Sequence, residues 1–514
     1  MMRAWVAWGP RVLPFADAAT PDLPLSRLLR LSLFQVSVGM ALVMLIGTLN
    51  RVMIVELDVP AWLVAIMISL PLLFAPFRAL IGFRSDTHRS ALGWRRVPYI
   101  WKGTFVQFGG LAIMPFALLV LSGSGNSGHA PLWVGRAGAA LAFLLVGAGL
   151  HTTQTVGLAL ATDLAAPESQ PKVVGLMYVM LLLGMIASAL VFGALLADFS
   201  DLLLVRVVQG SAVATMALNV VALWKQEARR PRGSVADAAR DPTFLESWRS
   251  FSSGERAVRR LVAVGLGTMG FSMEDVLLEP YGGQILHLNV GTTTKLTATL
   301  ALGGLIGFWL ASRVLSRGTD PFRMACIGAA VGVPAFMTVI IAAPLYSPLL
   351  FGLGTLAIGF GAGLFGHGTL TATMNKAPEN QRGLALGAWG AVQASGAGIA
   401  VALSGVIRDV VSAAAGQGLS LSATGAAASG YIAVYAIEVV LLLVTIVAMA
   451  PLVGPARPRI SSPRHESLGD ESEHVDWYYE HSVYSRISGS SIARQGTAGD
   501  LLRRNFEMPD RGHV

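Results

Sequence analysis

Long apolar runs separated by short polar segments occupy most of the chain from about residue 31 to residue 452. A membrane helix needs about 20 largely apolar residues to cross a hydrocarbon core of about 30 Å. Twelve runs reach that length, and each one predicts a membrane-spanning helix. We number these predicted helices spans one to twelve: 31–50, 60–81, 99–121, 133–160, 173–197, 202–224, 259–280, 292–312, 323–343, 348–374, 383–410 and 428–452.

One long polar segment, residues 225–258, follows the sixth span and divides the spans into two sets of six. The sequence APESQ at 166–170 recurs as APENQ at 377–381, and Asp198 matches Asp409 at the same offset. Two six-helix halves related by an axis along the membrane normal are typical of the major facilitator superfamily. We therefore predict an all-α integral membrane protein of that type. Its predicted parts are a segment at 1–30, halves at 31–224 and 259–452, a central loop at 225–258, and a mostly disordered tail at 453–514.

Charge gives the predicted orientation. Of the 38 Lys and Arg residues, 32 lie in the two tails and in alternate connections, all on one side of the predicted membrane. Cytoplasmic loops carry the excess of basic residues. Both termini are therefore predicted to be cytoplasmic, in a multi-pass membrane protein.

Composition excludes most soluble classes. Apolar residues make up 54% of the chain, and charged residues only 13%, about half of the usual quarter. A single cysteine, Cys326, excludes a disulfide framework and a cysteine-based metal cluster. No nucleotide-binding or metalloprotease motif stands out. We expect no enzyme activity, no dedicated metal or nucleotide, and no nucleic-acid partner.

Span seven carries the densest group of polar residues within a predicted span. Residues 271–283 read FSMEDVLLEPYGG and include Glu274, Asp275 and Glu279. In a continuous helix Asp275 and Glu279 share one face, and Pro280 with the following glycines would end or break that helix. These carboxylates are candidates for a proton or cation site or for an anchor of a polar ligand. The alternative is a helix end with solvated carboxylates.

Span one ends in NRVMIVELD, which contains Arg51 and Glu56. Equivalent helices of the two halves approach one another in this architecture, so these two side chains can pair with the carboxylates of span seven. A structural salt bridge between the halves and a switching contact are both compatible with the pattern.

Two histidines, His151 and His367, lie well inside spans and among small residues. A neutral imidazole with room beside it can bind the central magnesium of a chlorin or transfer protons. The alternative is a histidine that hydrogen-bonds to a neighbouring helix.

The connection between spans two and three resembles the loop that latches the cytoplasmic side of facilitators. It contains Asp86, followed by the pair Arg95 and Arg96. The gap before the arginine pair is longer than in that pattern. The loop therefore gives only moderate support for the fold, and it indicates no substrate.

Five segments together resemble the PucC/LhaA family, the bacteriochlorophyll delivery branch of the major facilitator superfamily. They are GTLNRVMIVEL at 47–57, FRALIGFRSD at 77–86, RRVPYIWKG at 95–103, EDVLLEPYG at 274–282 and LALGAWGAVQ at 384–393. The resemblance covers about residues 25–452.

The resemblance implies an assembly factor for light-harvesting antenna complexes in the intracytoplasmic or inner membrane of a phototrophic bacterium. Its implied partners are the antenna α and β polypeptides, membrane lipid and pigment biosynthetic enzymes, with bacteriochlorophyll as transient cargo. Composition alone favours a different class, a proton-coupled secondary transporter of a small solute. An assembly factor needs a lateral groove that faces lipid, whereas a transporter needs a central aqueous cavity.

Overall fold

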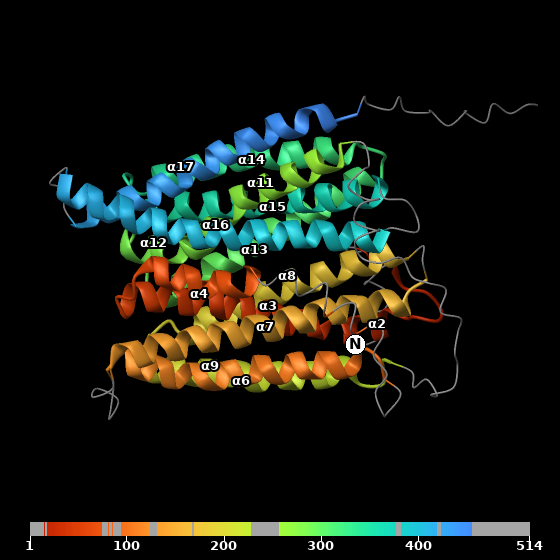
Figure 1. Ribbon diagram of the computed structural model, residues 1–514, viewed down its shortest axis with the longest axis horizontal. Coiled ribbons are helices and arrows are strands. Elements are labelled where there is room, and N and C mark those ends of the chain that lie inside the picture. The colour runs from red at the N-terminus through yellow and green to blue at the C-terminus, as the bar shows by residue number, and fades with distance from the viewer. Residues whose placement is uncertain are drawn as a thin grey trace, which may run out of the picture. The chain divides into compact units, whose positions relative to one another are not determined.

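The structure is a computed structural model, and its described part is helical throughout (Figure 1). The described residues are 15, 18–73, 81, 85, 94–123, 131–166, 169–227, 256–376, 382–418 and 423–454. The chain divides into Met1–Arg457, which holds all of these residues, and Pro458–Val514, which lies outside them. Most of the predicted tail and most of the predicted central loop therefore lie outside the described residues.

Spans one to six correspond to the elements of the N-terminal half. Span one is a single long helical run, Leu25–Glu56, in which two α-helices are followed by two π-helical stretches. The elements are α2 (Leu25–Leu31), α3 (Leu33–Leu42), η2 (Val43–Leu49), η3 (Val52–Glu56), α4 (Ala61–Leu73), α6 (Val97–Leu121), α7 (Leu132–Leu164), α8 (Gln170–Leu195) and α9 (Asp201–Leu223).

Spans seven to twelve correspond to the elements of the C-terminal half. Here span seven is split into three pieces, and the other spans are single helices. The elements are α11 (Ala257–Ser272), η5 (Glu274–Val276), α12 (Leu278–Gln284), α13 (Val290–Leu315), α14 (Pro321–Ala342), α15 (Pro348–Lys376), α16 (Arg382–Gly418), α17 (Ala423–Met449) and η7 (Ala450–Leu452).

The predicted helical architecture is confirmed. Eleven described helices are long and apolar enough to cross a membrane, and Ala61–Leu72 is a shorter apolar helix in the place of span two. Several starts are fixed by side chains that accept the first free backbone N–H groups. Asn289 accepts the N–H of Thr292 at 2.8 Å, and Asp320 accepts the N–H of Arg323 at 2.9 Å.

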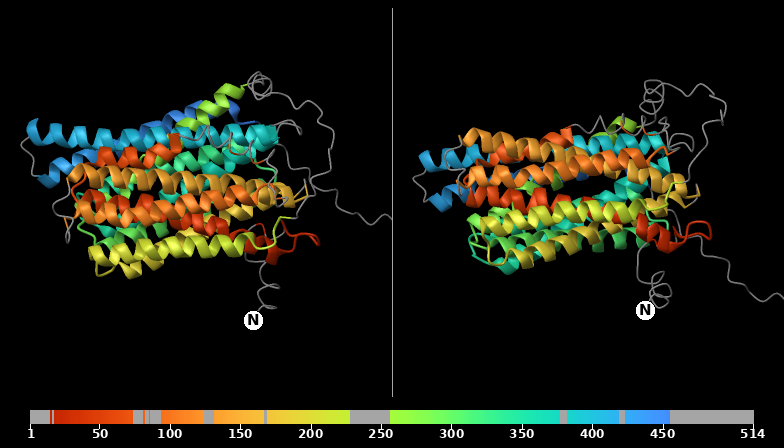
Figure 2. Two further views of the ribbon diagram at one scale, coloured as in Figure 1. Left: turned by 60° about the horizontal axis from the view of Figure 1, so that its bottom comes forward. Right: turned by 90° about the horizontal axis from the view of Figure 1, so that it is seen from below.

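The halves meet along two helix pairs, α4 with α16 and α8 with α13, and α13 also contacts η2 of span one (Figures 1 and 2). The predicted duplication makes span two equivalent to span eight and span five equivalent to span eleven. It therefore converts the α4–α16 contact into the α13–α8 contact. This exchange is what a two-fold relation between the halves requires.

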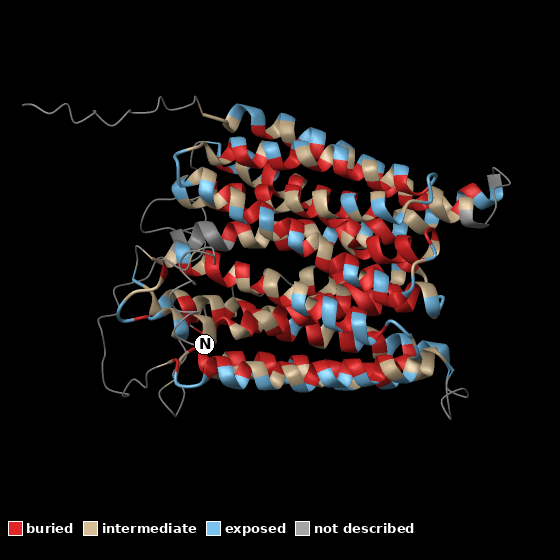
Figure 3. Cartoon of the chain, turned by 180° about the vertical axis from the view of Figure 1, so that it is seen from behind, coloured by how far each residue is buried: buried red, intermediate tan, exposed pale blue. Residues whose placement is uncertain are grey.

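Buried residues follow the inner faces of the helices, and exposed apolar residues lie on their outer faces (Figure 3). Phe116, Trp133, Leu349 and Val447 are each about 70% exposed. Large exposed apolar side chains are costly in water but suit contact with lipid tails. The exposed outer faces therefore agree with a bundle embedded in a bilayer.

Candidate functional site

The break in span seven is the centre of the candidate site. Helix α11 ends at Ser272, a single 3₁₀ turn follows, and α12 begins at Leu278. Two side chains from other spans satisfy the backbone groups that the break frees. Glu438 of α17 accepts the N–H of Glu274 at 2.7 Å, and the Asn50 amide donates to the carbonyl of Val276 at 2.6 Å.

This geometry corrects the prediction for span seven. The helix breaks before Pro280, which lies within the first turn of α12, where proline is tolerated. Because the break falls between Asp275 and Glu279, these residues are not four positions apart on one helix face. The solvated helix end is also wrong for Glu274 and Glu279, which are each only 2% exposed.

Glu274 and Glu438 form the most deeply buried part of the site. Glu438 is fully buried, and the Oε2 atom of each residue is buried with no hydrogen-bond partner among the described residues. The fully buried hydroxyl of Tyr435 likewise has no partner there. Asp275 lies beside them and is partly exposed.

Glu279 lies in a separate position, at the contact between spans one, seven and eight. The hydroxyl of Thr297 on α13 donates to its Oε1 atom. Gly47 of η2 faces the same atom, and a Cβ added there would lie 2.5 Å from it. The glycine therefore allows span one to pack directly against a buried carboxylate.

Among the described residues the direct ion-pair partner of Arg51 is not a carboxylate of span seven, although Arg51 lies within Coulombic range of Glu279. Its guanidinium instead pairs with Glu56 of its own span, whose side chain is 35% exposed. Arg51 still joins the two halves, because it donates to the carbonyl of Leu288 at 3.2 Å. The contact between the halves is thus a charge-assisted hydrogen bond to the backbone.

A second polar network joins α16 to spans two, seven and twelve. The Arg408 guanidinium lies 2.6 Å from Asp409, donates to Gln284 of α12, and lies over the Tyr431 ring at 4.8 Å from its centre. Asp409 also accepts the backbone N–H of Trp62 at 2.9 Å, at the start of α4. This cluster links the halves at their α4–α16 contact.

The arginines of the predicted latch pair with a carboxylate of α7 among the described residues. Asp86 lies outside them, and Arg95 and Arg96 both pair with Asp163 at the end of α7. Glu227, which follows α9, accepts the backbone N–H groups of residues 95, 96 and 97 at 2.8–3.0 Å. The arginine pair therefore joins the start of α6 to the ends of α7 and α9.

The two candidate pigment ligands lie in different halves of the bundle, His151 on α7 and His367 on α15. His151 is half-buried. His367 is buried, and its ring lies 4.2 Å from the Phe308 ring and 5.9 Å from the Phe15 ring, measured between centres. Its Nδ1 atom has no hydrogen-bond partner among the described residues.

A lateral groove lies between α8 and α9, with α3 as its floor. Its volume is about 420 Å³, within the range of small-molecule sites. Val191 and Leu195 on its walls are 53% and 50% exposed, so the groove faces the bundle's outside. The lining consists of Met40, Ala187, Ser188, Val191, Phe192, Leu195, Leu203, Arg206, Val207, Gly210, Ser211 and Ala214.

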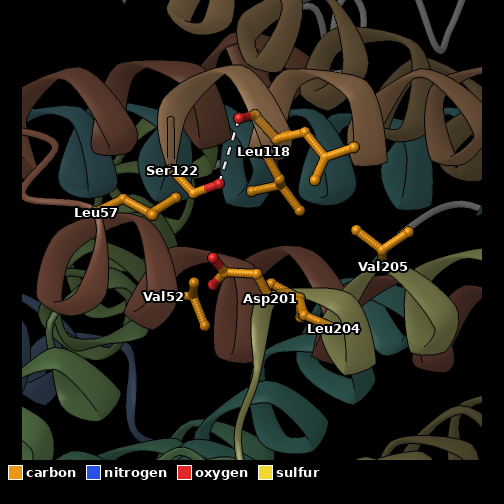
Figure 4. Close-up of a pocket in the computed structure, with 8 residues that line it drawn as sticks. Val52, Leu57, Leu118, Ser122, Asp201, Leu204 and Val205 are labelled. Atoms are coloured by element: carbon orange, nitrogen blue, oxygen red, sulfur yellow. Dashed lines mark hydrogen bonds between the residues drawn. The ribbon is translucent and has the colours of Figure 1, made fainter. Parts of the chain in front are cut away.

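A smaller cavity between η3, α6 and α9 has a volume of only about 10 Å³ (Figure 4). Val52, Leu118 and Leu204 contribute to its mostly apolar wall, and Ser122 donates to the Leu119 carbonyl at 3.3 Å. This space holds one water at most and is too small for an organic ligand.

Sequence reasoning missed Glu438, Tyr435, Thr297, Asp163 and Glu227. Glu438 had a usable signal, because it is an acidic residue in the middle of an apolar span. Tyr435 and Thr297 lie within spans but carry hydroxyl groups that are common there, and Asp163 and Glu227 follow the ends of spans. Only the packing of distant helices shows their partners.

Comparison with known proteins identifies the family. The family described as PUCC protein matches residues 48–456. Protein PucC of Rhodovulum sulfidophilum is 66% identical over 406 residues, which cover 78% of this chain and 89% of that protein. Protein PucC of Cereibacter sphaeroides is 59% identical over 448 residues, covering 87% and 96%.

Solved transporter structures share the fold. A bacterial homologue of the human lysosomal transporter Spinster matches with a TM-score of 0.60 at 15% identity, over 82% of this chain and 95% of that one. A bacterial homologue of the iron transporter ferroportin matches with a TM-score of 0.59 at 16% identity, over 83% and 98%. These structures show a major facilitator fold, and the match over most of the sequence shows that the chain belongs to the PucC family.

Proposed function

We propose that this protein is an assembly factor for bacterial light-harvesting antenna complexes, which carries bacteriochlorophyll to the antenna α and β polypeptides. Membership of the PucC family supports the photosynthetic setting. The apolar outer faces support delivery within the membrane. The proposal includes an inner or intracytoplasmic membrane location, cytoplasmic termini, and contact with lipid and with pigment biosynthetic enzymes.

The lateral groove is the observation that carries this proposal. It is open on the side where lipid and antenna helices would lie, and it is lined mainly by apolar and small residues. Among the described residues that line it, Arg206 is the cationic one. A guanidinium offers donors only, and the keto and ester carbonyl groups of bacteriochlorophyll offer acceptors only. The groove therefore suits a large apolar ligand that carries carbonyl groups at its edge.

Neither histidine lines the groove. For His367 to bind the magnesium of the pigment, its aromatic neighbours would have to move, because Phe308 and Phe15 pack against its ring. We therefore place the pigment in the groove. His151 and His367 stay candidate ligands of the pigment magnesium at other places, and each is tested by its own variant.

The test fills the groove without changing its charge. Gly210 lies on the groove wall, and a Cβ added there meets nothing within 4 Å, so Gly210→Leu adds bulk where the pigment would lie. Gly352 on α15 has the same open surroundings outside the groove, which makes Gly352→Leu the matched control. Each protein would be purified gently from the membranes of a phototrophic host.

Absorption spectra would give the bound pigment per protein, and mass spectrometry would identify bound antenna polypeptides. We expect pigment with the wild type and the Gly352→Leu control, and several-fold less with Gly210→Leu. Equal pigment in the two leucine variants would show that the groove is not the site. Pigment lost from His151→Ala or His367→Ala would assign a ligand role to that histidine.

The buried carboxylates of span seven favour a second candidate, a proton-coupled secondary transporter of a small solute. In that case an imposed proton gradient would drive solute uptake into proteoliposomes, and Glu274→Gln would abolish it. Absence of pigment and antenna polypeptides from the purified protein, together with such uptake, would replace the first proposal with the second.

A further inference from the structure

We propose that Glu274 and Glu438 form a proton-binding pair, which holds an exchangeable proton at the break in span seven. The pair joins the 3₁₀ turn of span seven to α17 of span twelve. This site does not depend on pigment delivery, and it does not require that any solute is transported.

The side chains of Glu274 and Glu438 lie close together at the break in span seven. The Glu438 carboxylate contacts the N–H of Glu274 at 2.7 Å, and the two side chains lie within Coulombic range of each other. Each residue has a buried Oε2 atom without a hydrogen-bond partner among the described residues. The two carboxyl groups thus have unused hydrogen-bonding capacity at the same buried place.

Tyr435 provides an independent sign that a small ligand belongs there. It lies one turn before Glu438 on α17, is fully buried, and interacts electrostatically with both glutamates. Its hydroxyl has no hydrogen-bond partner among the described residues. Buried polar groups are normally satisfied, so an unsatisfied one needs an explanation. A hydroxyl beside a carboxyl pair can accept or donate as the proton occupancy of the pair changes.

Among the residues that the structure describes, no cation forms an ion pair with Glu274 or Glu438. The ion pairs found among the described residues join other groups, including Arg51 with Glu56 and Arg408 with Asp409. The elements around the pair also carry titratable or charged groups. They include Asp275 of η5, Glu279 and Tyr281 of α12, Arg408 and Asp409 of α16, Tyr431 of α17, Arg323 and Cys326 of α14, and Arg259 and Arg260 of α11. Arg259 donates to the Ala448 carbonyl at 3.0 Å. Arg408 is engaged by Asp409, Gln284 and Tyr431.

Two neighbouring carboxylates buried without a cation cannot both carry a charge at low cost. Burial removes the water that stabilises each ion, and the second negative charge adds repulsion. One proton removes one charge and provides a donor for an unpartnered oxygen. Because Glu438 also accepts the backbone N–H of Glu274, proton release would change the charge at the junction of α11 and the 3₁₀ turn.

The test is infrared difference spectroscopy of the purified full-length protein, in H₂O and in D₂O. A protonated carboxyl group gives a C=O stretching band that shifts on deuteration. We expect this band in the wild type and its loss in the double variant Glu274→Gln/Glu438→Gln. Each single variant should change its frequency, and so should Tyr435→Phe, which removes only the facing hydroxyl.

Two controls separate this pair from other carboxyl groups. Asp275→Asn changes the adjacent acid and Asp198→Asn changes an exposed acid after α8, and both should leave the band in place. The single variants keep the test available if the double variant does not fold. The proposal fails if the wild type lacks the band, if Asp275→Asn removes it, or if the glutamine variants leave it unchanged. A further result would also overturn it: no C=O band of a protonated carboxyl group, together with a shift of the ionised carboxylate bands when Na⁺ is added. The site would then bind a cation and not a proton.

Discussion

Helices α13 and α15 approach so closely that Gly359→Ala should destabilise the protein. A Cβ added at Gly359 would lie 2.0 Å from the carbonyl oxygen of Leu300, and one added at Gly303 would lie 2.1 Å from that of Leu356. Both obstructing atoms belong to the backbone, which has no rotamer to change. The two helices would have to move apart to admit even one methyl group.

The structure also gives the expected size of the effect. The contact at 359 must open from 2.0 Å to beyond 3.0 Å, since real Cβ atoms do not approach other atoms more closely. Overpacking of this kind costs about 1–3 kcal/mol, while alanine regains about 0.5–1 kcal/mol over glycine within a helix. A contact of 2.0 Å to backbone belongs at the upper end of the overpacking range, so we expect a net loss of about 2 kcal/mol in the free energy of unfolding.

Gly366 on the same helix provides the matched control. A Cβ added there meets nothing within 4 Å, so Gly366→Ala should leave stability unchanged or raise it by about 0.5–1 kcal/mol. Thermal unfolding of the full-length proteins in one detergent would rank them. Gly359→Ala with the stability of the wild type would refute the reasoning, because the close helix contact would then have no energetic role.

Two further substitutions test the polar contacts. Thr297→Val removes the hydroxyl that donates to buried Glu279, so it should lower the free energy of unfolding by about 1.5–3 kcal/mol. Thr297→Ser keeps the hydroxyl and should cost far less. Equal stability of the two variants would contradict this hydrogen bond. Glu227→Gln should weaken the hydrogen bonds to the N–H groups at the start of α6 by about 1 kcal/mol in total. Amide hydrogen exchange at residues 95–97 should therefore become faster. Unchanged exchange would rule out the carboxylate as the acceptor of these groups.

Most of the fold was predictable because each membrane helix must contain its own long apolar run. The twelve runs and their 6 + 6 arrangement depend on length and composition, which the sequence states directly. The start of span one was less accessible. It begins at Leu25, before the predicted residue 31, because Leu28 and Leu31 are buried by packing that no local pattern displays.

The candidate site was predictable only in part, because its residues come from several spans. The acidic group of span seven was visible as charged residues in an apolar stretch. The direct partner of Arg51 was not predicted. Among the described residues its guanidinium pairs with Glu56, only five positions away, while Glu279 of span seven lies within Coulombic range. The carboxylate that pairs directly with Arg51 depends on the π-helical backbone of span one, which residue types alone do not determine.

The break in span seven shows why tertiary contacts decide where a membrane helix can be interrupted. Pro280 was the strongest local signal, yet proline is harmless in the first turn of a helix, where its missing N–H has no partner to lose. The break occurs instead where Glu438 and Asn50 can satisfy the freed N–H of Glu274 and the carbonyl of Val276. Unpaired backbone groups are expensive in a bilayer, so an interruption is stable only beside such partners. A site built on this break therefore belongs jointly to spans one, seven and twelve, and substitutions in any of the three should disturb it.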